Sequence, residues 1–502
     1  MSEPRISADV MANLFGCGKP RVHMAGICGI GMAGLAGLLR EQGVEVSGCD
    51  DAPNALAGWL RRRGIDVREG HDPAHVDTNI DAVVRTSAIR PDHPEIERAL
   101  ALGLPVRRRG EVLAALAGAL PTVAVAGTHG KTTTSAFVTS LLASAGPAPG
   151  WCIGGEVAGL DGPGGRGDGE WLVVEADESD GTLGLYAPEI AVLTNVEFDH
   201  MEHFDGVDAF RAVFQRFVDA TRRVVIYNAD DPAAAEICSE CPRAHSFGLG
   251  ETAHWRATEL TEAANGSEFT LWAEGKDPGR VRIPVPGRHN VYNALAALAV
   301  GRALDVNGEA LRAGAAGLAL PRRRFERVLT APNVTVISDY AHHPTEIASL
   351  VRTARAQAPG RRLRAVFQPH RYTRTRALGP DFPGAFDGVD ELVLIPVYAA
   401  SETPLEGGLC ADLYAHFRQA GTVPSVWLGG SLEEAWRYVK RSLGPDDTLL
   451  VVGAGSVEQL AARAREAWPA QTAGDGAAPA TGRGGAKDLP PAPWWSERLP
   501  DS

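Results

Sequence analysis

Cysteine is scarce in this sequence, and long apolar runs are missing from it. The seven cysteines among 502 residues are odd in number and scattered, which excludes a disulfide-stapled scaffold. No apolar run approaches the roughly 18 residues that a membrane-spanning helix needs, and the first residues lack the basic and then apolar pattern of a signal peptide. We therefore expect a cytoplasmic protein that has no partner in a membrane.

Positive charge is also in deficit. The net charge is −13 at pH 7, and so acidic a surface argues against broad binding of nucleic acid or of anionic membranes. Hydrophobic residues make up 44% of the chain and charged residues 22%, which is ordinary for a folded protein and excludes a wholly disordered one. At roughly 150 residues for each domain, the length predicts about three domains.

Two of the cysteines, Cys238 and Cys241, form a single C-x-x-C pair. A zinc site of this kind needs a second pair of ligands, and none stands nearby in the sequence. Ordinary reduced thiols are therefore favoured over a metal or redox role for this pair.

The order of apolar runs predicts an α/β fold in three domains. In the first domain, residues 1–118, β-rich runs alternate with helical stretches, which is the βαβ pattern of a Rossmann-like parallel sheet. The last domain, residues 321–468, repeats this doubly wound pattern after a central domain over 119–320. Residues 469–502 are rich in alanine, glycine and proline, and we expect them to be a disordered tail.

The central domain opens with a buried strand over 122–127, and a helix over 131–145 follows it. Two later runs, 171–177 and 189–196, have the composition of parallel strands that end in polar residues. Two segments between 254 and 274 alternate apolar and polar residues. This alternation predicts an antiparallel sheet added to the central domain.

A glycine-rich loop follows the first predicted strand. Gly29, Gly31 and Gly34 match G-x-G-x-x-G before a helix, where small residues let the backbone approach a pyrophosphate. Asp50 follows the second strand, at the place of a ribose-binding acid. A dinucleotide cofactor, another nucleotide diphosphate and tight helix packing with no ligand all remain open.

A second glycine loop is more specific. In the run from Gly127 to Thr132, backbone N–H groups can wrap a phosphate chain, Lys131 can reach its outer oxygens, and the Thr132 hydroxyl can hold Mg²⁺. The first glycine stands three positions before Gly130, whereas a standard P-loop has five. The chain has only five lysines against 44 arginines, so a lysine here indicates a need for its slim ammonium group. The alternative is a merely structural glycine turn.

Four carboxylates, those of Glu175, Asp177, Glu178 and Asp180, follow the run 171–174. They repel one another unless a cation lies between them, and ligands of α/β sheets bind at this end of the strands. Beside a phosphate loop, a Mg²⁺ site is the natural interpretation, and a solvated acidic turn is the alternative. His200 follows the next strand and is either a further metal ligand or a structural histidine.

Amide and basic side chains gather on both sides of the predicted boundary near residue 320. The segment 289–293 begins a helix, and its asparagines can cap that helix or contact an adenine edge. Arg323, Arg324 and Arg327 form a basic cluster, which is either a solvated charge run or a site for an anionic ligand.

Two polar loops close strands of the last domain. The first begins at Asp339 and closes what we take to be the first strand of that domain, and the second, over 367–374, closes the next. Arg371 and Arg374 are three residues apart, so they can share one face and hold a carboxylate. Loops at adjacent strand ends favour a binding crevice over two separately packed turns.

Taken in order, seven motifs resemble those of the Mur ligase family, over residues 22–456. The motifs are GTHGKTTT at Gly127, EADESDG at Glu175, TN and DH between Thr194 and His200, GRHNVYNALAA at Gly287, RRFE at Arg323, DYAHHPTEI at Asp339 and FQPHRYTRT at Phe367.

The resemblance implies a role for each group of residues. Gly29, Gly31, Gly34 and Asp50 would bind a UDP-linked substrate on the Rossmann-like first domain. The central domain would be a P-loop domain that binds ATP and Mg²⁺, with Lys131, Glu175 and His200 as catalytic residues and Thr132, Glu175 and His200 around the metal. The ATP-binding residues would be Gly127, Thr128, His129, Gly130, Lys131, Thr132, Thr133, Asn293, Arg327 and Asp339. The amino-acid pocket of the Rossmann-like last domain would be Tyr340, His342, Arg371 and Arg374.

The activity that the resemblance implies is ATP-dependent amide formation in peptidoglycan precursor synthesis, with UDP-N-acetylmuramate and L-alanine joined through an acyl phosphate. Residues 208–221 contain no lysine that could be carbamylated, which fits the alanine-adding branch. The GICGIG run at Gly26 partly resembles a recycling branch that adds a whole tripeptide, and this is the alternative. A nucleotide-binding regulator without catalysis is disfavoured, because the catalytic residue types are all present. We expect a monomer or a homodimer.

Overall fold

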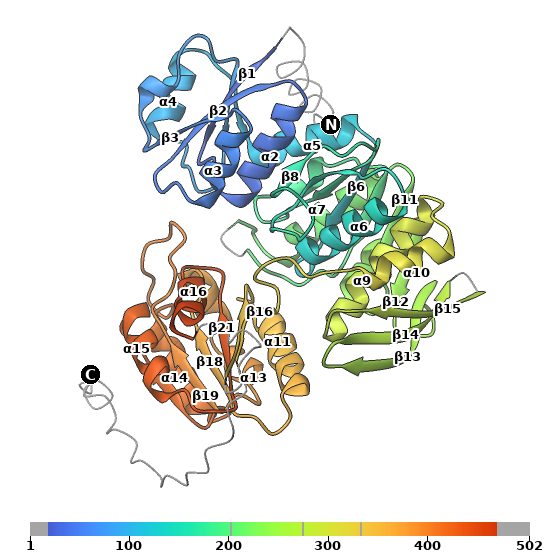
Figure 1. The fold of residues 1–502 in the computed structure, drawn as a ribbon. Helices are drawn as coiled ribbons and strands as arrows, with labels where there is room; N and C mark the ends of the chain where they lie inside the picture. The colour runs from blue at the N-terminus through green and yellow to red at the C-terminus, as the bar shows by residue number, and fades with distance from the viewer. Residues whose placement is uncertain (1–18, 201–202, 274–275, 332–333, 469–502) are drawn as a thin grey trace, which may run out of the picture. The chain divides into compact units, whose positions relative to one another are not determined.

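The computed structural model describes residues 19–200, 203–273, 276–331 and 334–468 (Figure 1). The predicted tail, 469–502, therefore lies outside the described residues. The chain forms two compact units that meet after Arg324, and each is described by itself below. Within the described ranges, no helix combines the length and the apolarity that crossing a membrane requires. The predicted α/β class is confirmed, with three separate sheets.

The first sheet is wholly parallel, in the order β3-β2-β1-β4-β5, as a Rossmann-like pattern predicts. The helix expected after the glycine-rich loop begins at Ile30, so Gly31 and Gly34 lie within the helix. The elements are β1 (Arg21–Ala25), α2 (Ile30–Glu41), β2 (Glu45–Asp50), α3 (Ala55–Arg62), β3 (Asp66–Glu69), η1 (Pro73–His75), β4 (Ala82–Arg85), α4 (Pro94–Ala101), β5 (Val106–Arg108) and α5 (Arg109–Ala119).

The central sheet has ten strands in the order β15-β14-β13-β12-β11-β10-β6-β9-β7-β8. Its β13, β14 and β15 are antiparallel, which confirms the predicted addition. Its strands are β6 (Thr122–Ala126), β7 (Gly150–Cys152), β8 (Gly164–Gly165), β9 (Leu172–Glu175), β10 (Ile190–Leu193), β11 (Val224–Asn228), β12 (Ala244–Gly248), β13 (Trp255–Ala263), β14 (Gly266–Ala273) and β15 (Lys276–Ile283). Its helices are α6 (Lys131–Ala145), η2 (Thr182–Leu185), α7 (Val207–Ala220), α8 (Pro232–Cys238), α9 (Arg288–Ala303) and α10 (Gly308–Ala316).

Strand β6 is buried on both faces because helices cover both sides of the central sheet. Val123 and Val125 join the core under α6 and α9, whereas Ala124 and Ala126 point into the core that contains α7. Alternate residues of a strand face opposite sides, so an entirely apolar strand is what this two-sided burial requires. The end of β6 is thereby held in place for the loop that follows it.

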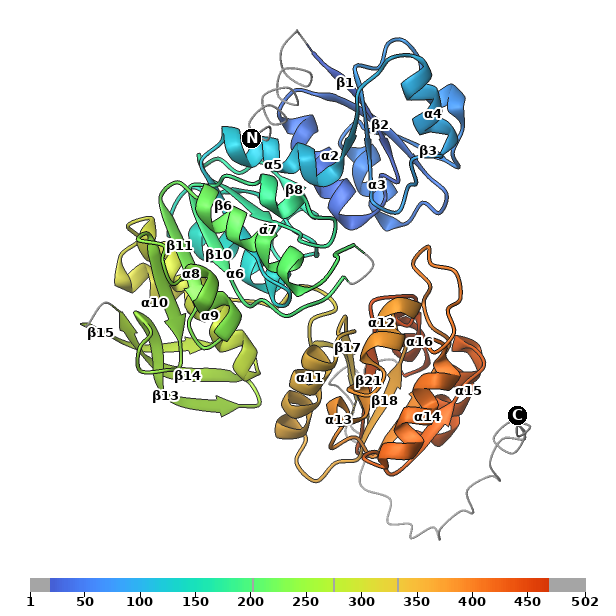
Figure 2. The ribbon, with the colours of Figure 1, turned by 180° about the vertical axis from the view of Figure 1, so that it is seen from behind.

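In the second unit, β16 is antiparallel to β17 and the other strands are parallel, in the order β16-β17-β21-β18-β19-β20. Figure 2 labels β17, β21 and β18 of this sheet. Helices α15 and α16 pack against one core that includes β21. The strands are β16 (Glu326–Ala331), β17 (Val334–Asp339), β18 (Leu363–Phe367), β19 (Glu391–Leu394), β20 (Val426–Leu428) and β21 (Asp447–Val452). The helices are α11 (Pro344–Gln357), α12 (Tyr372–Leu378), α13 (Phe382–Ala385), α14 (Cys410–Ala420), α15 (Leu432–Ser442) and α16 (Glu458–Ala467).

Two expectations about this last sheet were wrong. The strand that ends at Asp339 is not the first, because β16 precedes it. Strands β17 and β18 are not neighbours either, because β21, which comes last in the chain, lies between them. In a parallel sheet, a crossover helix can return the chain to a position between two strands that were formed earlier in the sequence. The order of strands along the chain therefore does not determine their order in the sheet.

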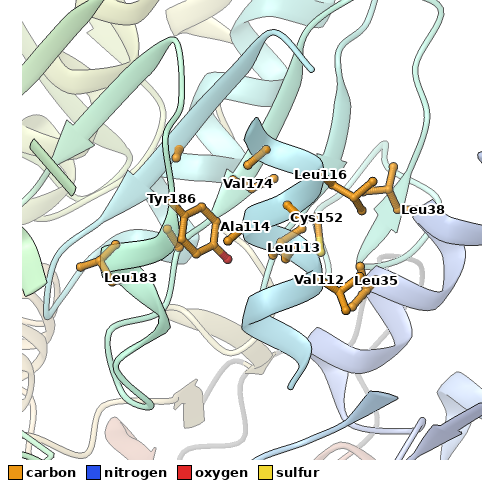
Figure 3. Close-up of a cluster of buried hydrophobic side chains, with 14 of the residues drawn as sticks. Leu35, Leu38, Val112, Leu113, Ala114, Leu116, Cys152, Val174, Leu183 and Tyr186 are labelled. Carbon is orange, nitrogen blue, oxygen red and sulfur yellow. The ribbon is translucent and has the colours of Figure 1, made fainter. Parts of the chain in front are cut away.

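The first and central sheets share one hydrophobic core. Figure 3 shows α5 within it, with Leu35 and Leu38 of α2 on one side and Leu183 and Tyr186 on the other. Helix α5 follows β5 directly and ends just before β6, so it links the two sheets as well as covering both. This shared core is the reason that the first 324 residues form one compact unit.

A close contact beside α5 gives a test of this packing. A Cβ added at Gly110 would lie 2.0 Å from Thr182 Oγ1, a distance that no packed atoms tolerate. We expect Gly110→Ala to lower the free energy of unfolding by about 1–3 kcal/mol, despite the better helix propensity of alanine. In Gly58→Ala, the matched control on α3, the nearest atom would be Arg62 Nη1 at 3.9 Å. That control should be neutral or slightly stabilised in denaturant unfolding, and equal behaviour of the two variants would contradict the packing.

Candidate active site

The loop between β6 and α6 needs its glycines. Gly127 has φ of 136° and Gly130 has φ of 82°, a region that side chains disfavour. Space is also short, since a Cβ at Gly127 would lie 2.0 Å from Thr194 Oγ1 and one at Gly130 would lie 2.8 Å from Asn293 Oδ1. Helix α6 begins at Lys131, and the N–H groups of its first turn have no partner within the helix. The loop and helix end together are suited to bind an anion.

Lys131 lies at this loop, and its side chain is largely buried. Its Nζ donates to Gly127 O at 2.6 Å, to Thr128 O at 3.1 Å and to Glu178 Oε1 at 2.8 Å. Burial by itself would lower the pKa of Lys131, but the carboxylates of Glu178 and Asp177 raise it above its ordinary value. The ammonium group therefore stays charged and is held beside the loop.

The protein itself neutralises much of the acidic segment. Arg109 Nη2 lies 3.3 Å from Asp177 Oδ2, and although burial opposes it, Arg109 followed by Lys131 holds the pKa of Asp177 at about 2. Asp180 Oδ1 accepts hydrogen bonds from the N–H and hydroxyl of Thr182. Cationic side chains of the protein itself therefore lie against Asp177 and Glu178, whereas Glu175 and Asp180 have none within salt-bridge distance among the described residues.

Glu175 and Thr132 lie together at the start of α6. Thr132 Oγ1 donates to Glu175 Oε1 at 3.0 Å, and Gly154 N donates to Glu175 Oε2 at 2.7 Å. A carboxylate and a hydroxyl are hard oxygen donors of the kind that Mg²⁺ prefers, so this donor set fits that ion. His200 lies near this pair, because its Nε2 is 3.7 Å from Oε1 of Glu178, the carboxylate that pairs with Lys131.

The segment after β10 braces the phosphate loop. Asn195 Oδ1 accepts from His129 N at 2.8 Å, and Glu197 Oε2 lies 2.7 Å from His129 Nε2. Thr128 Oγ1 donates to Glu197 O at 2.7 Å. Asn195 was quoted only as part of the TN motif, with no role assigned, and Glu197 was not named. The missed signal was the polar run that directly follows the predicted strand.

Asn293 is buried and packs against the same loop. Its Oδ1 accepts from Thr134 Oγ1 at 3.1 Å, and its Nδ2 donates to Asn290 Oδ1 at 3.1 Å. The first of these bonds joins α9 to α6, and the second lies within α9. Thr133, the next residue of α6 after Thr132, is also buried.

The glycine loop of the first sheet is shaped by Asp50. Its two carboxylate oxygens accept from Cys28 N at 2.9 Å and from Ala52 N at 3.1 Å. A Cβ at Gly34 would lie 2.9 Å from Pro163 O, so this glycine serves close helix packing. Gly29 is the N-cap of α2, and Gly31 lies beside Arg109, whose Cδ would be 3.3 Å from an added Cβ. Arg109, which the sequence analysis missed, therefore lies between this loop and Asp177.

In the second unit, the predicted pocket residues come together around His370. The ring of His342 lies 5.5 Å from that of Tyr340 and 5.6 Å from that of His370, measured between centroids. Arg374 is buried and donates from Nη1 to His370 O at 3.3 Å. Arg371 Nη1 lies 3.5 Å from Glu402 Oε1. Ring and hydrogen-bond contacts thus link Tyr340, His342 and Arg374 by way of His370, although the strands before them are not adjacent.

The two ATP-binding candidates of this unit have different partners. Asp339 accepts hydrogen bonds from Ala341 N at 2.8 Å and from Phe325 N at 2.7 Å, so it organises the turn before α11. Arg327 lies on β16 and donates to Gln357, the last residue of α11. The register of β16 on β17 places Arg327 opposite Ile337, two positions before Asp339, while the Arg327 side chain extends toward the end of α11.

Comparison with known proteins agrees with this arrangement. Residues 21–120 match the model described as Mur ligase family, catalytic domain, residues 125–301 match the Mur ligase middle domain, and residues 323–455 match the Mur ligase, glutamate ligase domain. A UDP-N-acetylmuramate–L-alanine ligase of Kineococcus radiotolerans is 43% identical over 403 residues, which are 78% of this chain and 85% of the relative.

Solved structures share the fold. The UDP-N-acetylmuramate–alanine ligase of Thermotoga maritima has a TM-score of 0.76 at 27% identity, over 89% of this chain and 98% of that one. A murein peptide ligase of Psychrobacter arcticus has a TM-score of 0.69 at 24% identity, over the same shares, and at that identity the likeness concerns the fold alone.

Proposed function

The chain belongs to the Mur ligase family, and from this premise we propose that it is an ATP-dependent ligase that joins L-alanine to UDP-N-acetylmuramate in peptidoglycan synthesis. The observation that supports this most is the identity of 38–43% to three alanine ligases, over 78–88% of this chain. The consumption of ATP favours the cytoplasm as the compartment, and the six described cysteines are all free of disulfides.

The proposed reaction has two steps. The carboxylate of UDP-N-acetylmuramate attacks the γ-phosphorus of ATP, which gives an acyl phosphate and ADP. The amine of L-alanine then attacks the acyl carbon, and phosphate leaves as the amide forms. Lys131 and the first-turn N–H groups of α6 would stabilise the negative charge on the transferring group.

Thr132 and Glu175 would hold Mg²⁺, with His200 as the third candidate ligand. Mg²⁺, when bound, supplies positive charge beside phosphoryl oxygens. Thr128 and His129, braced by Glu197, would keep the loop in its phosphate-binding conformation. Gly127, Gly130, Thr133, Asn293, Arg327 and Asp339 are proposed to complete the ATP site.

The substrates would occupy the other predicted sites. Gly29, Gly31 and Gly34 would let the backbone approach the diphosphate of UDP-N-acetylmuramate, and Asp50 would hold that loop in shape. Tyr340, His342, Arg371 and Arg374 would surround the amino acid. Both arginines can pair with its α-carboxylate, which leaves the amine directed at the acyl phosphate.

Removal of the charge at Glu175 tests the metal proposal. Glu175→Gln keeps the side-chain size, so we expect the fold to persist while turnover falls by about 10–100-fold. The Mg²⁺ concentration for half-maximal activity should rise at the same time. Glu170→Gln, an exposed change just before β9, is the matched control. Steady-state rates across a Mg²⁺ series measure both effects, and an unchanged Mg²⁺ dependence would remove Glu175 from the metal site.

A direct competition experiment separates the two branches of the family. Purified protein is given UDP-N-acetylmuramate, ATP and Mg²⁺ with equal amounts of L-alanine and the murein tripeptide, and the products are identified by mass. We expect L-alanine to be joined in preference to the tripeptide. When glycine or L-serine is supplied in place of L-alanine, we expect weaker ligation, because one methyl contact discriminates between amino acids by only about 1–3 kcal/mol. Preference for the tripeptide would instead establish the recycling activity.

A further inference from the structure

A buried group of metal-ligating side chains lies in the first sheet, apart from the proposed ATP and amino-acid sites. It consists of His23 on β1, Cys49 on β2, His75 on η1 and Glu95 on α4. One ligand atom from each residue lies within 4.8 Å of the other three. His23, Cys49 and Glu95 are each at most 1% exposed. Four chain segments thus converge on one point with two imidazoles, a thiol and a carboxylate.

The distances suit a small tetrahedral ion. A zinc ion with bonds of about 2.0–2.3 Å places neighbouring ligand atoms roughly 3.3–3.6 Å apart. Cys49 Sγ lies 3.5 Å from His23 Nε2 and 3.0 Å from Glu95 Oε1. Glu95 Oε1 lies 3.8 Å from His23 Nε2 and 2.9 Å from His75 Nδ1. Small side-chain shifts would make these separations equal.

Two further side chains contact the group. Ser47 Oγ lies 3.2 Å from His23 Nδ1, which presents Nε2 to the centre, as an outer partner of a metal ligand does. His71 Nδ1 lies 3.0 Å from the second carboxylate oxygen of Glu95 and 3.1 Å from Cys49 Sγ, so it orients both of these side chains. The side chains of His71 and His75 are 9% and 14% exposed, so an ion has a route from solvent on that side.

Charge and ligand chemistry favour one metal. We propose that His23, Cys49, His75 and Glu95 bind a zinc ion that fastens β1, β2, η1 and α4 together. A thiolate and a carboxylate carry the two negative charges that balance Zn²⁺, so the buried site is neutral when filled. Sulfur and imidazole ligands favour zinc over Mg²⁺, which prefers oxygen. All four positions are protein ligands, as in structural rather than catalytic zinc sites.

The site also adjoins the glycine loop. Cys49 precedes Asp50, whose carboxylate holds Cys28 N, so the ion would steady the strand end that shapes this loop. This role does not depend on which amino acid the enzyme adds. The C-x-x-C pair Cys238 and Cys241 contributes nothing to it, because neither thiol belongs to the group.

The test measures metal content and spectrum in the full-length protein. We expect protein produced with zinc to keep about one zinc ion for each chain after gel filtration. Plasma mass spectrometry measures this zinc content. Cys49→Ser and His75→Gln should each lose most of that zinc, while the Cys238→Ser/Cys241→Ser control should keep it. Stripping the wild type with a chelator should lower its thermal midpoint by several degrees, and zinc should restore it.

Cobalt gives an independent readout. The stripped wild type loaded with Co²⁺ should show a thiolate-to-cobalt charge-transfer band and the visible bands of a tetrahedral ion, both absent in His75→Gln. If Cys49→Ser does not fold, the wild-type cobalt spectrum and His75→Gln still decide the matter. Wild-type protein without retained zinc, without the cobalt band, or with zinc that disappears in the control variant would overturn the proposal.

Discussion

Replacing Lys131 with alanine is expected to lower the turnover of ligation by about 10²–10³-fold, because it removes a cation aimed at the phosphate loop. The ammonium already contacts the loop carbonyls of Gly127 and Thr128, so a bound phosphate chain would meet it without rearrangement of the backbone. The rate of ADP release at saturating substrates measures this loss. Near-normal turnover would contradict the role proposed for Lys131.

The same substitution also lowers stability, because Lys131 is the counter-charge of Glu178. Glu178 is fully buried and lies 2.8 Å from the lysine ammonium. Loss of the lysine leaves a buried carboxylate without its counter-charge, which costs about 3–5 kcal/mol in comparable pairs. A lost activity could then reflect a weakened fold.

A double variant separates the two effects. In Lys131→Ala/Glu178→Gln the unpaired charge is gone, so thermal stability should return toward the wild type while turnover stays low. Glu178→Gln alone reports what the carboxylate contributes. If the double variant regained both stability and activity, Lys131 would be a structural partner of Glu178 rather than a phosphate ligand.

Much of the fold could be predicted because its signals are local. The switch from the buried strand before Gly127 to a helix at Lys131 is a change of pattern within ten residues, and α6 has the predicted bounds. The alternation near Trp255 likewise predicts the antiparallel strands. Such patterns reflect burial on one or two faces, which each segment encodes by itself.

The features that were missed depend on segments far apart in the chain. The position of β21 between β17 and β18 follows from how crossovers return, and no single segment encodes it. Arg109 belonged to an ordinary basic run until folding placed it against Asp177. The proposed zinc ligands come from four elements and have no motif spacing, whereas Cys238 and Cys241 have motif spacing but belong to no ligand group among the described residues.

The amino-acid pocket gives the second large effect, and its two arginines differ in ways that guide the experiment. Arg374 is 4% exposed and donates to His370 O, so its removal would also disturb packing. Arg371 is more exposed. Its backbone N donates to Tyr398 O, and its backbone has a positive φ of 70°. Alanine and arginine tolerate this φ about equally, so Arg371→Ala should leave the backbone as it is and is the cleaner test.

We expect Arg371→Ala and Arg374→Ala each to raise the KM for L-alanine by roughly 30- to 1,000-fold, the loss of about 2–4 kcal/mol of charge-assisted binding. The KM for ATP should change little, because the arginines would contact only the amino acid. Arg371→Lys should restore part of the affinity, since it returns the charge but not the planar pair of donors. Arg376→Ala, exposed on the same helix, is the matched control and should behave as the wild type. An unchanged dependence on alanine in both arginine variants would move the carboxylate site elsewhere, whereas equal rises in both KM values would indicate a general loss of the fold.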